Sequence, residues 1–80
     1  AYAEVVARYG DDPTPALREQ VAMALVNKGV ELGVVGRSAE AVAAYAEVVA
    51  RYGDDPALAL REQVVRALVN KSIWLGILGR

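Results

Sequence analysis

The sequence predicts an all-α fold, a short α-solenoid of about four helices arranged as stacked antiparallel hairpins. Three observations predict it. The chain repeats itself at a spacing of 43 residues, apolar residues follow the helical period, and glycine, proline and capping residues separate the segments.

The internal repeat runs through the whole chain. Residues 1–37 pair with residues 44–80, and nine of these 37 pairs differ, so 28 are identical. Each copy of such a repeat is one supersecondary unit, whose apolar face must be buried against a neighbouring unit. We therefore expect a single domain over residues 1–80, with one copy at 1–43 and a second, incomplete copy at 44–80.

The first helix is expected over about residues 1–9 and ends at Gly10, because glycine readily adopts the left-handed conformation that closes a helix. A second helix is expected over about residues 15–35. It begins with Thr14 as the N-cap and Pro15 in the first turn, the position where proline is best tolerated.

The third and fourth helices repeat this punctuation. The third is expected over residues 38–52, after Gly36 closes the second helix and with Ser38 as its N-terminal cap. The fourth is expected over residues 57–78, after Asp55 and the proline that follows it.

Apolar residues within these segments recur at helical spacing. On the second helix the residues at i, i+4 and i+7 are Leu17, Val21, Leu25, Lys28, Leu32 and Val35. Lys28 is the one charged residue in this series, and its aliphatic stem can cover apolar surface. Adjacent valines, such as Val5 and Val6, break the alternation that a strand requires, so the valine content does not predict a sheet.

The composition excludes several classes of partner and compartment. Nine Lys and Arg against ten Asp and Glu give a net charge of −1 with the signs interspersed, which argues against a nucleic acid or a membrane surface as partner. No apolar run approaches the roughly 20 residues that span a bilayer. The absence of cysteine and of a secretory signal pattern predicts a cytoplasmic location.

No catalytic, cofactor or metal site is expected. The chain has no His and no Cys, so the commonest general base and the strongest nucleophile are both absent. The acidic pairs at 11–12 and 54–55 are assigned to helix capping, because a calcium loop needs several more oxygens at set spacing. Gly29, Gly33 and Gly36 do not form a phosphate-binding pattern and are assigned to helix packing. We expect no enzymatic activity.

Residues 24–56 carry the spacing of a known helical repeat. The matching positions are Leu25, Lys28, Gly29, Leu32, Ala41, Tyr45 and Pro56. They resemble the tetratricopeptide repeat (TPR), whose pattern is W-x2-L-G-x2-Y, then A-x3-F, then P. Gly29 and Ala41 would let the two helices of a hairpin approach closely, with Tyr45 filling the space beside them. Because the period of 43 exceeds the usual length of about 34, the chain resembles a lengthened branch of the family.

The resemblance implies a peptide-binding groove lined by the first helix of each hairpin. Carried over by position, its lining residues are Met23, Val26, Asn27, Val30 and Val34, followed by Arg66, Val69, Asn70, Ile73 and Ile77. The basic residues with which some family members hold a terminal carboxylate are replaced here by valine and isoleucine. The expected function is therefore a non-enzymatic protein-interaction scaffold that binds an apolar segment of a protein or peptide.

Trp74 stands where the first copy has Glu31, a position that would face water in a simple array. Either the last helix is covered differently from the first, or Trp74 contacts another molecule. The second interpretation is preferred, because aromatic anchors are enriched in interface hot spots.

Self-assembly is the alternative function that the sequence predicts. The chain begins inside the second helix of a hairpin and ends before the residue that would cap the next one, so two helix faces are expected to lack partners. The expected self-association residues are Trp74, Leu75 and Leu78, in a homodimer or a head-to-tail stack. The homodimer is preferred, because closed symmetry is the commoner outcome. An excised or engineered repeat fragment with no independent function is the remaining alternative.

Overall fold

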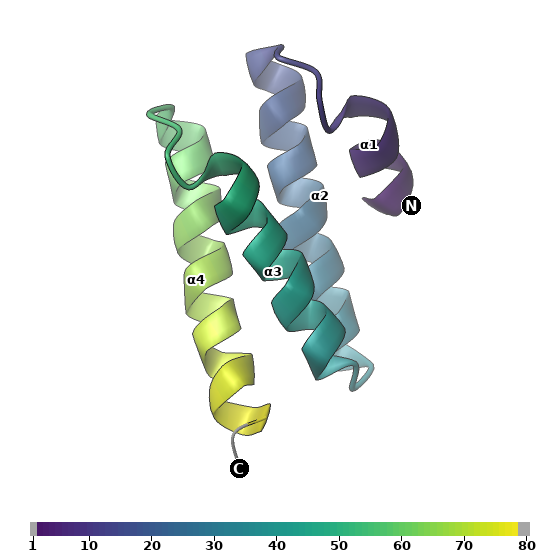
Figure 1. Ribbon diagram of the computed structural model, residues 1–80. Helices are drawn as coiled ribbons and strands as arrows, with labels where there is room; N and C mark the ends of the chain where they lie inside the picture. The colour runs from purple at the N-terminus through teal and green to yellow at the C-terminus, as the bar shows by residue number, and fades with distance from the viewer. Residues whose placement is uncertain (1, 79–80) are drawn as a thin grey trace.

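The structure is a computed structural model that describes residues 2–78, with the backbone alone at Ala3 and Leu78. In this part of the chain the regular secondary structure is entirely α-helical, and four helices pack against one another (Figure 1). The helices are α1 (Tyr2–Tyr9), α2 (Pro15–Val34), α3 (Ser38–Tyr52) and α4 (Leu58–Leu78). The all-α prediction is confirmed, and the helices end within one residue of their predicted limits.

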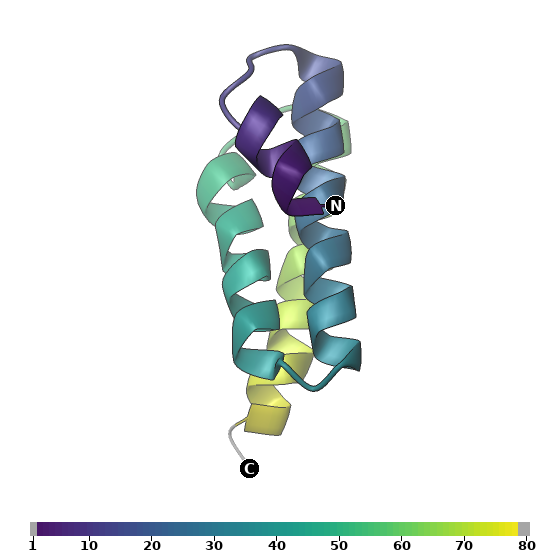
Figure 2. The same cartoon turned by 90° about the vertical axis from the view of Figure 1, so that its right-hand side faces the viewer.

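The four helices pack mainly as neighbours along the chain. α3 packs against both α2 and α4, and α2 and α4 also contact each other. Among the described residues, α1 packs against α2 and against no other helix, and Figure 2 shows this short helix on the outer side of the bundle. None of the helices in residues 2–78 combines the length and the apolar character needed to cross a bilayer.

The core lies where α2, α3 and α4 meet. Its buried side chains are Val21, Ala22, Leu25, Val26, Ala41, Tyr45, Val48, Tyr52, Leu60, Val64 and Ala67. Alanine and valine make up most of this set, so the helix backbones can lie close together. The largest fully buried side chain is Tyr45, which fills the space between them.

Glycines on α2 provide the room for two aromatic rings. A Cβ atom at Gly29 would lie 2.5 Å from Cε1 of Tyr45, far inside van der Waals contact. A Cβ atom at Gly33 would likewise overlap the indole of Trp74 on α4. Gly29 and Gly33 are one helical turn apart, so Tyr45 of α3 and Trp74 of α4 pack on adjacent turns of α2.

Aspartate side chains stabilise the turns that lead into α2 and α4. Oδ1 of Asp12 accepts a hydrogen bond of 2.8 Å from the amide of Thr14, and Oδ1 of Asp55 accepts one of 2.8 Å from the amide of Ala57. Thr14 is the N-cap residue of α2, as predicted, but its side chain makes no capping hydrogen bond. The hydrogen bonding of Asp12 with Thr14 lowers the pKa of the Asp12 carboxyl.

Gly10 does not adopt the predicted left-handed conformation. Among the described glycines only Gly36 has a positive φ, of 83°. Gly10 instead donates its amide to the carbonyl of Val6 at 2.8 Å, which continues the helical hydrogen-bond pattern. Its own carbonyl accepts a hydrogen bond of 3.1 Å from Nη1 of Arg51. A side chain from the second repeat therefore stabilises the end of α1.

The predicted cap of α3 is displaced by one residue. Ser38 is the first helical residue, and Arg37 occupies the N-cap position without a side-chain capping hydrogen bond. The guanidinium of Arg37 instead pairs with the carboxylate of Glu40 at 2.6 Å. The first turn of α3 thus carries an ion pair, and no side chain caps its backbone amides.

Candidate binding surfaces

Some of the charged side chains of the described residues form ion pairs within the chain. No group of three acidic side chains in this part of the chain comes together to hold a metal ion. The ion pairs of the structure are Arg8–Glu4, Arg18–Asp55, Arg37–Glu40 and Arg51–Glu47. Large apolar side chains are also exposed on α2 and α4.

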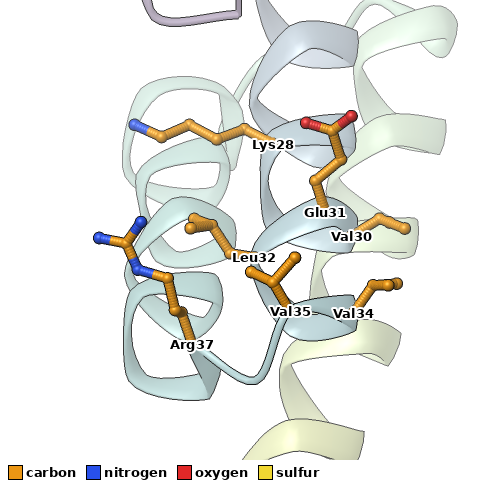
Figure 3. Close-up of a pocket in the computed structure, with 7 residues that line it drawn as sticks. All are labelled: Lys28, Val30, Glu31, Leu32, Val34, Val35 and Arg37. Carbon is orange, nitrogen blue, oxygen red and sulfur yellow. The ribbon is translucent and has the colours of Figure 1, made fainter.

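Four of the predicted groove residues are exposed apolar side chains on two helices that pack against each other. Val30 and Val34 on α2, and Ile73 and Ile77 on α4, are between 42% and 79% exposed. Figure 3 shows Val30 and Val34 projecting from the side of α2 on which α4 lies. Because α2 and α4 pack against each other, these residues lie on neighbouring helices, and we refer to them as the α2–α4 strip.

Val26 does not line an open surface. It is 0% exposed and belongs to the cluster where α2, α3 and α4 meet. The sequence predicts which side of the helix Val26 occupies, but the packing of neighbouring helices buries that position. Its counterpart in the second repeat, Val69, is 54% exposed.

The other predicted groove residues lie at different places on the surface. Met23 and Asn27 line a hollow together with Tyr2, Val5 and Tyr9 of α1. Arg66 is exposed on α4, and Asn70 is half-buried. The predicted groove residues therefore do not all line one surface, and the α2–α4 strip contains those that are apolar and exposed at equivalent positions of both repeats.

A shallow hollow of about 580 Å³ lies at the C-terminal end of α2 (Figure 3). Its lining residues are Lys28, Val30, Glu31, Leu32, Val34, Val35 and Arg37. The valine and leucine side chains give it an apolar floor, and the charged groups of Lys28, Glu31 and Arg37 stand around it. Since Val30 and Val34 belong to both features, the hollow adjoins the α2–α4 strip.

Trp74 is half-buried within its own chain. The indole packs on Gly33 and against the buried core. The contact with Gly33 shows that α4 is covered differently from α2 at this position, and the contact of Trp74 with another molecule stays a prediction. Leu75, the next predicted self-association residue, is 47% exposed, whereas the side chain of Leu78 lies outside the described part of the chain.

Two buried tyrosines carry polar groups in the core. Burial raises the pKa of Tyr45 and of Tyr52 above the usual tyrosine value. Neither hydroxyl has a hydrogen-bond partner of good geometry within the described residues. The Trp74 side chain lies near the Tyr45 hydroxyl and offsets part of the rise in its pKa, but it does not meet hydrogen-bond geometry. Among the expected TPR-like repeat positions, Leu32 is half-buried and Ala41 is fully buried.

Equivalent positions of α2 and α4 fall into two groups by burial. Val30 and Val34 are exposed, and so are their counterparts Ile73 and Ile77. By contrast, Leu25 is 1% exposed whereas its counterpart Leu68 is 45% exposed, although both residues are leucine in similar local sequence. We call the positions that α4 exposes and α2 covers more fully the α4 edge face: Val65, Leu68, Val69, Ser72 and Leu75.

Comparison of the chain with protein-family models, with curated proteins and with solved structures found no match. The fold, the α2–α4 strip and the α4 edge face are therefore the observations on which a functional proposal rests.

Proposed function

We propose that this chain is a non-enzymatic protein-interaction module of TPR-like hairpins that binds an apolar segment of a protein or peptide along the α2–α4 strip. The observation that carries the proposal is the strip itself, four large apolar side chains exposed on two helices in contact. Apolar side chains gathered at one place on a surface mark interaction sites, whereas scattered ones do not.

The course of the chain supports the hairpin architecture. In Figure 1, α2 and α4 run down the view and α3 runs up it. Each pair of consecutive helices is in contact, and the two equivalent helices α2 and α4 also touch. These are the relations that stacked antiparallel hairpins of a short α-solenoid require.

The side chains of the strip suit an apolar ligand. Valine and isoleucine are stiff at χ1, so they lose little freedom when a partner covers them. The residues recur at i and i+4 on each helix, which places them about one helical turn apart. Among the predicted groove residues only Arg66 is charged, so affinity should change little between low and high salt.

A peptide library displayed on phage tests the proposal, with the double variant Val34→Glu/Ile77→Glu as the probe of the strip. The control is Ala39→Glu/Ala50→Glu, which adds the same charge at exposed positions of α3. We expect apolar peptides to be enriched on the wild type and on the control, and to be lost on the strip variant. Peptides that bind all three proteins equally, or acidic peptides whose binding collapses in salt, would contradict the proposal.

A further inference from the structure

The α4 edge face consists of positions that are better covered in the first repeat. In α2 the equivalents of Leu68 and Val69 are Leu25 and Val26, which lie in the core shared with α3 and α4. We propose that α1 of a second copy of this chain packs on the α4 edge face, so that the copies associate head to tail. Each junction would reproduce the packing of α3 on α2, and it concerns a different surface from the α2–α4 strip.

The occupant is identified by the sequence of α1. Tyr2, Val5 and Tyr9 are the repeat equivalents of Tyr45, Val48 and Tyr52. The three residues of α3 are buried in the core, at 4% exposure or less. In α1, Tyr9 is 39% exposed, and Tyr2 and Val5 are only half-buried. The residues that cover α2 inside the chain are therefore present a second time, with much of their surface uncovered.

A charged pair gives the junction its register. Inside the chain, Arg18 forms an ion pair with Asp55, and its guanidinium lies 5.9 Å from the ring centroid of Tyr52. The equivalents of Arg18 and Asp55 are Arg61 and Asp12. Arg61 is exposed and makes no ion pair within the described residues. The same geometry across the junction places Arg61 of one copy against Asp12 and Tyr9 of the next.

A second polar contact also has its repeat equivalents in place. Nη1 of Arg51 donates to the carbonyl oxygen of Gly10 at 3.1 Å. The equivalents are Arg8 and Gly53. Across the junction, Arg8 of the next copy would donate to the carbonyl of Gly53. Both polar contacts therefore favour a head-to-tail arrangement with the register of the internal repeat.

Ser72 opposes close packing at the same junction. Its counterpart is Gly29, where an added Cβ atom would lie 2.5 Å from Cε1 of Tyr45. The Cβ atom of Ser72 would meet the ring of Tyr2 from the next copy in the same way, so that ring has to shift. The serine thus weakens the junction, and a glycine at this position would strengthen it.

The proposed junction does not use Trp74, and it predicts an open stack in place of a closed dimer. The indole of Trp74 already packs on Gly33 of its own chain. A contact between α4 of one copy and α1 of the next joins two different surfaces, and such a contact leaves a free α4 and a free α1 at the two ends. The average mass should therefore rise past the dimer as concentration increases.

Sedimentation velocity over a concentration series tests the junction. We expect Ser72→Gly to tighten association about tenfold, as would follow from relief of one steric overlap. Ser72→Ala is the matched control, because it removes the hydroxyl and keeps the Cβ atom, and it should associate like the wild type. Monomers at every concentration for both wild type and Ser72→Gly, or a mass that stops at the dimer, would overturn the proposal.

A charge exchange tests the register. Arg61→Glu and Asp12→Arg should each weaken association about five- to tenfold, because a half-buried pair is replaced by like charges. An equimolar mixture of the two variants should recover association, since every mixed junction pairs opposite charges. Arg37→Glu changes the net charge as Arg61→Glu does and should leave association unchanged. With helix content verified by circular dichroism, a mixture that stays as weak as its components would overturn the assigned pair.

The two proposals can fail separately. Val34→Glu/Ile77→Glu should abolish peptide binding and leave head-to-tail association intact, because the strip positions are exposed in both repeats. Loss of association in Arg61→Glu should leave peptide binding intact.

Discussion

Tyr45 is buried completely, yet its hydroxyl has no hydrogen-bond partner of good geometry among the described residues. We therefore expect Tyr45→Phe to keep or raise the urea midpoint, because it removes an unsatisfied buried polar group that costs about 1 kcal/mol or more. Tyr45→Ala should lower the free energy of unfolding by about 3–5 kcal/mol, because it leaves a cavity in the core.

Glu47→Ala is the control for Tyr45. Its carboxylate makes an exposed i, i+4 pair with Arg51, and such pairs contribute about 0.5 kcal/mol. A Tyr45→Phe variant as unstable as Tyr45→Ala would show that the hydroxyl, and not the ring, is the group that holds the helices together.

Asp12 makes the start of α2 sensitive to acid. Its pKa is lower in the folded chain than in the unfolded chain, so the carboxylate form stabilises the fold. This contribution is present above the unfolded aspartate pKa, about 3.9, and is lost as the pH falls through the lower folded value. Asp12→Asn keeps an acceptor oxygen without the charge. We expect its thermal midpoint to lie below that of the wild type at neutral pH and the two to converge in acid.

The comparison of midpoints against pH needs no other variant, because both proteins share every remaining titratable group. A gap between wild type and Asp12→Asn that stays constant from neutral to acidic pH would show that the charge of Asp12 is irrelevant to stability.

At the scale of the helices, α2 and α4 contrast because one has more neighbours than the other. α2 packs against three helices, whereas α4 packs against two within the described residues. Both helices are apolar on several sides, as expected for elements that lie between neighbours in a stack of repeats. The apolar residues of α4 are therefore more exposed because α4 has one fewer neighbouring helix than α2, although the two sequences are similar.

The equivalent residues Gly33 of α2 and Gly76 of α4 allow the packing of the two helices to be compared by the same substitution. A Cβ atom at Gly33 would overlap Trp74, whereas one at Gly76 meets nothing within 4 Å. Gly33→Ala should destabilise by about 1–3 kcal/mol through overpacking. Gly76→Ala should stabilise by up to about 1 kcal/mol, because alanine is the better helix former. Thermal unfolding of dilute samples measures both, and shifts of the same sign would contradict the packing described for α2.

At the scale of the whole molecule, stability should fall toward α1. This helix has eight residues and contacts α2 alone among the described helices, and isolated helices shorter than about 12 residues are marginal in water. We expect the α1 amides to exchange with solvent fastest and those of α2 and α3 slowest. Hydrogen exchange followed by NMR measures this gradient, and equal protection of α1 and α3 would contradict it.

Much of the fold follows from local signals in the sequence. Prolines, glycines and acidic residues separate segments of helical period, and the observed helices end within one residue of the predicted limits. The errors concern groups whose partners lie far away in sequence. The carbonyl of Gly10 accepts a hydrogen bond from Arg51, and Val26 is buried in a core shared with two later helices. A helical period predicts which side of a helix is apolar, but not which neighbour covers it.

The repetition of "AYAEVVARYGDD" also bears on how the chain reaches its structure. Because contacting helices are neighbours along the chain or separated by one helix, folding should be fast, in about microseconds to milliseconds for helical domains of this kind. The same twelve residues, however, occur in α1 and its following loop and again at the end of α3 and its loop. We expect these two segments to compete during folding for the site on α2 that α3 occupies, because only the additional first turns of α3 distinguish them. A chain in which α1 packs at the α3 site must break that contact before folding can continue. Near-identical repeats therefore introduce a kinetic trap into an otherwise fast folding reaction.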